Sequence, residues 1–318
     1  MTQTTGLGAG TGVEASTRVL VGLTVLAGAL LSVQARVNGS LASELGSSVV
    51  TALVSFSVGT AALLILVVAA RRWQRARHAR SERPLRWWWF CGGLGGAFLV
   101  ATSALAVPRI GVALLGVGIV AGQTVGSLVV DEVGLSPRGR QPITVFRAVG
   151  AALAVAALAI GAMADRRELM LGLFALIALA GGGVAAQQAA NGHLQRLTGE
   201  PLVAALISFS VGTVALALLA VVLTASGQVG SLSWPGEPGL YLGGLCGATY
   251  ITLAAAAVGR LGVLRLTLAS VAGQLLGAVL LDVVRPAVGD SVEVGTVVAT
   301  ALTFVAVLIS GRGGRARR

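Results

Sequence analysis

The chain contains one long segment twice. The 27 residues from Gln34 to Thr60, QARVNGSLASELGSSVVTALVSFSVGT, return from Gln187 to Thr213 as QQAANGHLQRLTGEPLVAALISFSVGT, with 14 identical positions. Further on, GGLGGA matches GGLCGA and AGQTVGSLVVD matches AGQLLGAVLLD. Rare polar residues match too: Gln34 with Gln187, Asn38 with Asn191, Gln123 with Gln274, Arg109 with Arg260, and Asp131 with Asp282. Because apolar matches alone would mean little in this composition, the polar matches predict a tandem duplication of one unit.

Long apolar stretches of about 20 residues recur through both halves, and each is long enough to cross a hydrocarbon core of about 30 Å as a helix. Only 11% of the residues are charged and 55% are hydrophobic, whereas soluble domains carry about 25% charged residues. We therefore expect an all-α membrane protein. Its ten predicted transmembrane helices are 18–37, 49–70, 87–107, 110–130, 142–163, 169–191, 201–224, 241–258, 263–284 and 293–311.

Each half contains five predicted helices, an odd number, so the second half should enter the membrane in the opposite sense to the first. The charges agree: residues 71–86 carry seven arginines, whereas the equivalent connection, 225–240, carries no basic residue. By the positive-inside rule the first connection is cytoplasmic and the second external. This predicts two inverted-topology five-helix repeats with both termini cytoplasmic. The predicted units are a tail at 1–17, repeats at 18–163 and 164–311, and a basic tail at 312–318.

Glycines recur at small-xxx-small spacing in both repeats. In lipid, such residues let helix backbones approach closely, so they predict helix-contact faces, with substrate contact as the alternative. The glycines are Gly59, Gly92, Gly96, Gly122, Gly126, Gly212, Gly243, Gly247, Gly273 and Gly277. A different role is expected for Asn38-Gly39 and Asn191-Gly192, where glycine would adopt the left-handed conformation that ends a helix.

Uncharged amides are the candidate lining of a substrate pathway. The six residues are Gln34, Asn38, Gln123, Gln187, Asn191 and Gln274. A primary amide in hydrocarbon needs partners, and it offers both donors and acceptors to a solute or to another helix. Substrate contact and interhelical hydrogen bonding therefore both remain open.

Two matched carboxylates, Asp131 and Asp282, end predicted helices, where they oppose the helix dipole and should have a partner or a role. They could pair with a basic residue and latch a gate, and Arg109 and Arg260 are the candidates; an ordinary interfacial aspartate is the alternative. Arg36 has Ala189 as its counterpart. It could favour an anionic or zwitterionic solute, or it could be an arginine that reaches the interface.

Other function classes receive little support from the sequence. The net charge of +11 is explained by membrane topology and contact with anionic lipid headgroups, so no nucleic-acid partner is expected. No Asp, Glu or Lys lies in the middle of a predicted span, and no Walker loop is present. A catalytic cluster, a metal site and a cofactor are likewise not expected.

The duplicated Q…NG.L…G….A.ISF.VGT pattern and the AGQ…G…D segments resemble the YdcZ-like branch of the drug/metabolite transporter superfamily, the EamA-like inner-membrane transporters. The resemblance covers about 18–311. It implies ten helices in two inverted repeats, a bacterial inner-membrane location, and small-solute transport, often export. It also implies that Gln34, Asn38, Gln123, Gln187, Asn191 and Gln274 line a central cavity. Small multidrug resistance proteins of this superfamily carry a glutamate in their first helix, which this chain lacks.

The sequence thus predicts a secondary transporter that moves a small metabolite or drug-like solute by alternating access, and the resemblance implies export. The alternatives are a scaffold or partner subunit that does not transport, or a membrane-embedded enzyme. Expected partners are membrane lipid and an unidentified small-molecule substrate, and the working unit is a monomer or a homodimer. Substrate identity, transport direction and coupling ion are not encoded in a readable motif.

Overall fold

The computed structural model describes residues 8–78, 85–137, 139–164, 170–284 and 294–312, and the regular elements in these ranges are all helical. Two short 3-10 helices, η1 (Trp87–Cys91) and η2 (Pro238–Tyr241), precede α4 and α8. The α-helices are α1 (Gly8–Leu45), α2 (Ser48–Ala69), α3 (Arg72–His78), α4 (Gly92–Glu132), α5 (Val145–Ala164), α6 (Met170–Thr198), α7 (Pro201–Ala225), α8 (Gly243–Val284) and α9 (Val294–Arg312).

Helices α1 and α6 run past the points where the sequence predicted their ends. Each contains the Asn-Gly pair in its interior, and the left-handed glycines that follow the helices are Gly46 (φ +84°) and Gly199 (φ +66°). The predictions for Gly39 and Gly192 were therefore wrong. Glycine serves close approach there, since a Cβ on Gly39 would lie 2.6 Å from a methyl carbon of Val107.

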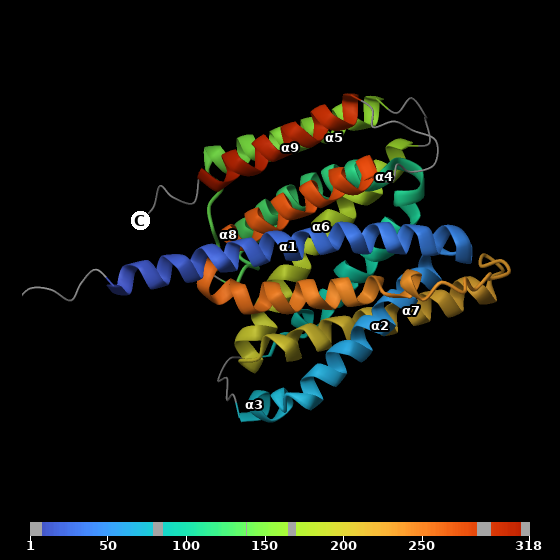
Figure 1. The fold of residues 1–318 in the computed structure, drawn as a ribbon, viewed down its shortest axis with the longest axis horizontal. Helices are drawn as coiled ribbons and strands as arrows, with labels where there is room; N and C mark the ends of the chain where they lie inside the picture. The colour runs from blue at the N-terminus through green and yellow to red at the C-terminus, as the bar shows by residue number, and fades with distance from the viewer. Residues whose placement is uncertain (1–7, 79–84, 138, 165–169, 285–293, 313–318) are drawn as a thin grey trace, which may run out of the picture.

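Helix α4 folds back on itself. Pro108 lies inside it, and Gly111 adopts φ +74° and ψ 175°, a conformation that interrupts the helix and favours glycine. Both halves of α4 pack along α6, with Gly95 against Gly183 and Gly126 against Gly182. Residues from its two ends line one pocket. The two halves therefore run antiparallel, and Figure 1 shows the second half returning beside the first.

Helix α8 also reverses, as its contacts with α1 reveal. A Cβ on Gly247 would meet the amide of Gln34, whereas one on Gly277 would meet Ala29. Farther on, Asp282 contacts Arg36. The first part of α8 thus runs antiparallel to α1, and the last part runs parallel to it. Figure 1 shows these parts as two separate orange segments.

The helices pair between the two halves of the chain. Helix α1 packs on α8, α6 on α4, α2 on α7, and α5 on α9. The α1–α8 and α6–α4 pairings are equivalent, because α1 and α6 occupy the same position in the two halves, as do α4 and α8. In Figure 1, α5 and α9 form a separate pair at the top of the molecule, while α1, α4, α6 and α8 surround its centre. This arrangement brings equivalent residues of the two repeats together.

Five helices within the described residues are long and apolar enough to cross a membrane: Arg18–Leu45, Ser48–Ala69, Trp87–Glu132, Leu171–Thr198 and Pro201–Ala225. Shorter apolar helices occupy Val145–Ile160 and Ala269–Val284. The apolar residues on the outer faces of α2 and α7 are exposed, among them Ile65, Val68, Leu218 and Val221. Such a surface suits a lipid bilayer rather than water.

Candidate functional site: a cavity between the two repeats

Four predicted pathway residues, Gln34, Gln123, Gln187 and Gln274, meet in one cavity of about 70 Å³, which we call the central cavity. They come from α1, α4, α6 and α8, and each is at most 9% exposed. The other lining residues are Leu31, Phe56, Gly96, Leu99, Val100, Ile119, Val184, Gln188, Phe209, Gly247, Tyr250, Ile251, Ser270 and Val271. The two halves of the chain thus contribute equivalent amides to one cavity.

The amides differ in how they are satisfied. Gln187 donates to the Ser208 hydroxyl at 3.4 Å. The side-chain amides of Gln34, Gln123 and Gln274 have no hydrogen-bond partner among the described residues. Because these three amides face the cavity, their donors and acceptors are available to a molecule that enters it.

Two phenylalanines close one side of the central cavity. Phe56 on α2 and Phe209 on α7 occupy equivalent positions in the repeats, and their rings stack with centroids 4.8 Å apart and planes inclined by 23°. Glycines make the stack possible, since a Cβ on Gly59 would strike the ring of Phe209 and one on Gly212 the ring of Phe56. Hydrophobic burial and ring stacking thus join α2 and α7 directly beside the amides.

The other predicted glycines lie where helices of opposite halves touch. A Cβ on Gly96 would lie 2.7 Å from the Gln187 Nε2, and one on Gly247 would lie 2.9 Å from the Gln34 amide. A Cβ would also lie too close to a residue of the opposite half at six other glycines: Gly92, Gly122, Gly126, Gly243, Gly273 and Gly277. Glycine is therefore the residue that allows the amide-bearing helices to approach the opposite half.

The asparagines lie about one helical turn from the central cavity and do not line it. Asn38 is buried against Gly243, and Asn191 lies against Gly92, where a Cβ would be 3.0 Å from its Oδ1. Neither polar atom of the Asn38 side chain has a hydrogen-bond partner among the described residues. The asparagines therefore pack against glycines of the opposite half, one turn beyond the glutamines that line the cavity.

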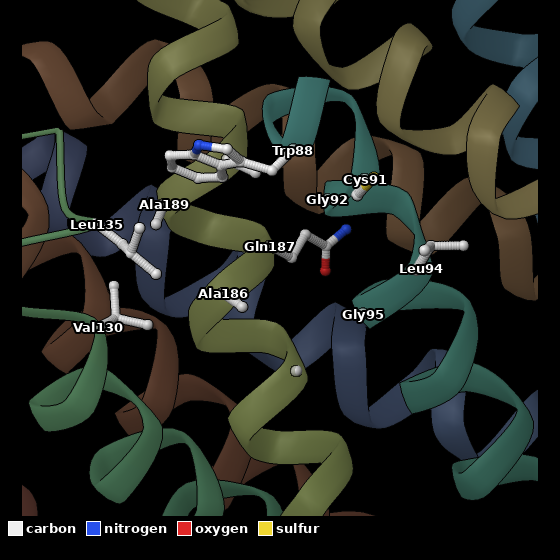
Figure 2. A pocket seen from close by; sticks show the side chains of 12 residues that line it. Trp88, Cys91, Gly92, Leu94, Gly95, Val130, Leu135, Ala186, Gln187 and Ala189 are labelled. Atoms are coloured by element: carbon white, nitrogen blue, oxygen red, sulfur yellow. The ribbon is translucent and has the colours of Figure 1, made fainter. Parts of the chain in front are cut away.

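A second, larger pocket of about 300 Å³ lies beside Gln187 between α6 and both ends of α4. Figure 2 shows Gln187 projecting from α6 toward Gly92 and Gly95 at the start of α4, with Trp88 above it and Leu135 and Val130 to its left, beyond α6. Gln187 lines both this side pocket and the central cavity. One side chain thus separates an apolar recess from the polar centre.

Asp282 binds the break in α4. Its carboxylate accepts hydrogen bonds from the backbone N–H groups of Val112 and Ala113, at 3.2 and 2.7 Å. It also pairs with Arg36 on α1 at 2.7 Å. Positions 112 and 113 begin the second half of α4, where unpaired N–H groups and the helix dipole attract an anion. Three helices from both halves of the chain therefore meet at this carboxylate.

Within the described residues, both aspartates pair with arginines other than the candidate Arg109. Asp131 pairs with Arg147 on α5, and Asp282 with Arg36, because those arginines lie across the helix contacts. Arg109 is exposed and donates to the carbonyl of Leu105 in its own helix. The side chain of Arg260 lies outside the described residues. Arg36 is paired with Asp282 within the protein, so it is not a free anion site.

Tyr250 and Ser270 are lining residues that the sequence analysis missed, and Phe56 and Phe209 also went unremarked. A signal for the first two existed. The repeat offset pairs Tyr250 with Leu99 and Ser270 with Ile119, so they are polar exceptions in a duplicated apolar pattern. Tyr250 and Ser270 have no polar counterpart in the first half, so matching polar residues between the halves does not identify them.

The fold and cavity define a multi-helix membrane protein with a small polar centre. The sequence matches the model of the family described as "Putative inner membrane exporter, YdcZ" twice, over residues 19–160 and 172–309. The chain belongs to this family, which places it in the inner membrane as a multi-pass protein of a transporter family rather than an enzyme family. A search of curated proteins found no match. Within the described residues no cluster of three or more metal-ligating side chains occurs.

Proposed function

We propose that the protein is a secondary transporter that exports a small metabolite or drug-like solute across the bacterial inner membrane by alternating access. The observation that carries this proposal is the central cavity, to which both halves contribute equivalent glutamines and phenylalanines. A solute bound there touches both repeats. A change in the contact between the repeats would therefore open the cavity to one side of the membrane or the other.

Ten membrane crossings in two inverted repeats are part of this proposal. The 46-residue span Trp87–Glu132 would measure about 69 Å as one straight helix, more than twice the hydrocarbon thickness. Its reversal at Gly111 makes two crossings, and the reversal in α8 makes two more. Figure 1 supports the inversion, because the segment after α7 lies at the right-hand end and α3 lies at the lower left. Both termini would then be cytoplasmic.

The contact of Asp282 with Arg36 and the start of the second half of α4 is the proposed gate. Its equivalent in the other repeat is different, since Asp131 pairs with Arg147 and lies partly exposed. The Asp282 contact therefore holds α1, α4 and α8 together at the break in α4. Both halves of the cavity come from one chain, so a monomer suffices for transport, and a homodimer would not be needed to complete the site.

Reconstituted protein and a metabolite library test the transport function. We expect at least one compound to cross proteoliposome membranes only when protein is present. For that compound, Gln123→Leu and Gln274→Leu should each lower the rate about tenfold or more, because each variant removes a donor and an acceptor from the cavity. Gln228→Leu, in an exposed loop, is the matched control and should retain the wild-type rate.

If Gln123→Leu and Gln274→Leu transported the compound as fast as the Gln228→Leu control, the cavity would not be the transport pathway. Absence of protein-dependent flux for every compound, with folded protein recovered from the vesicles, would contradict transport itself.

A further inference from the structure

The lining of the central cavity contains no charged side chain among its described residues. Its polar groups are the amides of Gln34, Gln123, Gln187, Gln188 and Gln274, the Tyr250 phenol and the Ser270 hydroxyl. An ion moved from water to such a site would lose its hydration without gaining a counter-charge, at a cost of several kcal/mol. A neutral solute would lose less, and the amides can replace its hydrogen bonds.

The described ion pairs do not change this balance, and Asp131, eight residues after Gln123 on α4, is matched by Arg147. Asp282 lies eight residues after Gln274 on α8, about 12 Å along the helix, and its charge is matched by Arg36 and by two backbone N–H groups. Two opposite charges in contact produce a weak field at that distance. The centre of the cavity is therefore close to electrically neutral as well as polar.

The unpaired amides indicate what the solute must offer. Gln34, Gln123 and Gln274 are each more than nine-tenths buried and line the cavity without a hydrogen-bond partner in the described part of the chain. Every primary amide presents two donors and a carbonyl acceptor. A solute that carries both a donor and an acceptor can satisfy them, whereas a purely apolar solute would leave them unpaired.

The two sides of the cavity are chemically different. Tyr250, Ser270 and Gln188 all belong to the second half of the chain, and their equivalents in the first half, Leu99, Ile119 and Ala35, are apolar. The stacked Phe56 and Phe209 rings add an apolar face that suits a planar group. A solute with a polar end and an apolar, planar body would therefore bind with its polar end toward the second half.

We propose that the central cavity selects a small uncharged solute that has an amide-like donor and acceptor group on a planar apolar body, and that it discriminates against cations and anions of the same shape. This proposal rests on the transport function proposed above and names its substrate class. At about 70 Å³ the cavity is smaller than the roughly 300 Å³ at which ligand pockets begin. Solute binding therefore requires the helices to separate from their present, closed arrangement.

Three probes of nearly equal shape test the charge preference: benzamide, which is neutral, benzamidinium, a cation, and benzoate, an anion. Their dissociation constants are measured with purified full-length protein in detergent, by ligand-observed NMR titration at pH 7. We expect benzamide to bind at least tenfold more tightly than either ion. Gln274→Glu, which adds one negative charge in nearly the same volume, should reverse the order in favour of benzamidinium.

A pair of exchanges between the halves tests the orientation. Tyr250→Leu removes the phenol and should weaken benzamide binding about tenfold, the effect of one lost hydrogen bond. Leu99→Tyr places the same group on the opposite side and should not strengthen binding. Size-exclusion profiles that match the wild type show that both variants fold.

The proposal is overturned if either ion binds wild-type protein as tightly as benzamide, if none of the three probes binds, or if Gln274→Glu leaves their order unchanged. Because the readout is binding, its result is separate from that of the flux experiment. A transporter that moves only charged solutes would contradict this inference and leave the transport function standing.

Discussion

Single glycines set the distance between the two halves of the molecule. A Cβ on Gly122 would overlap the carbonyl oxygen of Ala178, and one on the equivalent Gly273 would overlap that of Val25. Backbone atoms cannot move aside as a side chain can, so the helix itself would have to shift. Since the amides of the cavity lie on the same helices, glycine packing determines the geometry of the site.

We predict that Gly273→Ala lowers the stability of the folded protein by about 1–3 kcal/mol, the usual cost of extra volume at a packed contact. The midpoint of thermal denaturation in detergent measures it. Gly22→Ala is the matched control, because Gly22 is also helical but has open space around its Cβ position. It should be neutral or slightly stabilising. Equal effects of the two substitutions would contradict the close contact at Gly273.

At the scale of elements, the break in α4 and the carboxylate that binds it form one unit. Gly111 supplies the conformation, Asp282 accepts from Val112 and Ala113, and Arg36 neutralises the charge. A Cβ on Gly111 would lie 3.0 Å from an Asp282 carboxylate oxygen, so glycine is favoured there for space as well as for φ. The arrangement joins α8 to the point where α4 reverses.

We predict that Asp282→Asn destabilises the protein by about 3 kcal/mol, because the buried Asp282 carboxylate accepts from two backbone N–H groups as well as from Arg36. The new NH₂ group would also face a backbone N–H donor. Asp131→Asn removes the equivalent carboxylate, which is more exposed than that of Asp282 (22% against 10%) and pairs with Arg147, so it should cost about 1 kcal/mol or less. Unfolding midpoints of the two variants give the comparison, and a loss as large for Asp131→Asn would refute the distinction between the two sites.

At the scale of the whole molecule, the duplication predicted much of what the structure contains. Matched glutamines identified the four amides that meet in the cavity, because a polar residue kept at two equivalent positions needs an equivalent environment in each half. Helix ends were harder to predict, since glycine at position 39 serves close packing and glycine at position 46 ends the helix. The sequence alone does not distinguish these uses.

Pairings between distant segments also escaped prediction. Arg36 and Asp282 are 246 positions apart, and their contact follows from how α1 packs along α8. The comparison of the repeats instead suggested the matched arginines, Arg109 and Arg260, as partners of the aspartates. Tyr250 and Ser270 were overlooked because their equivalents are apolar. A comparison that keeps only matching residues discards Tyr250 and Ser270, although these residues make the two sides of the cavity chemically different.

The last prediction concerns the orientation of the whole molecule in the membrane. In protein with Cys91 and Cys246 replaced by alanine, a cysteine at His78 should react with an impermeant thiol reagent only from the cytoplasm, and one at Ser233 only from outside. The arginine-rich connection carries the first position, and the connection without basic residues carries the second. Ser233 is exposed and accessible to the reagent. Labelling of both positions from the same side of sealed vesicles would rule out inverted repeats, and with them an exchange of equivalent conformations between the two halves.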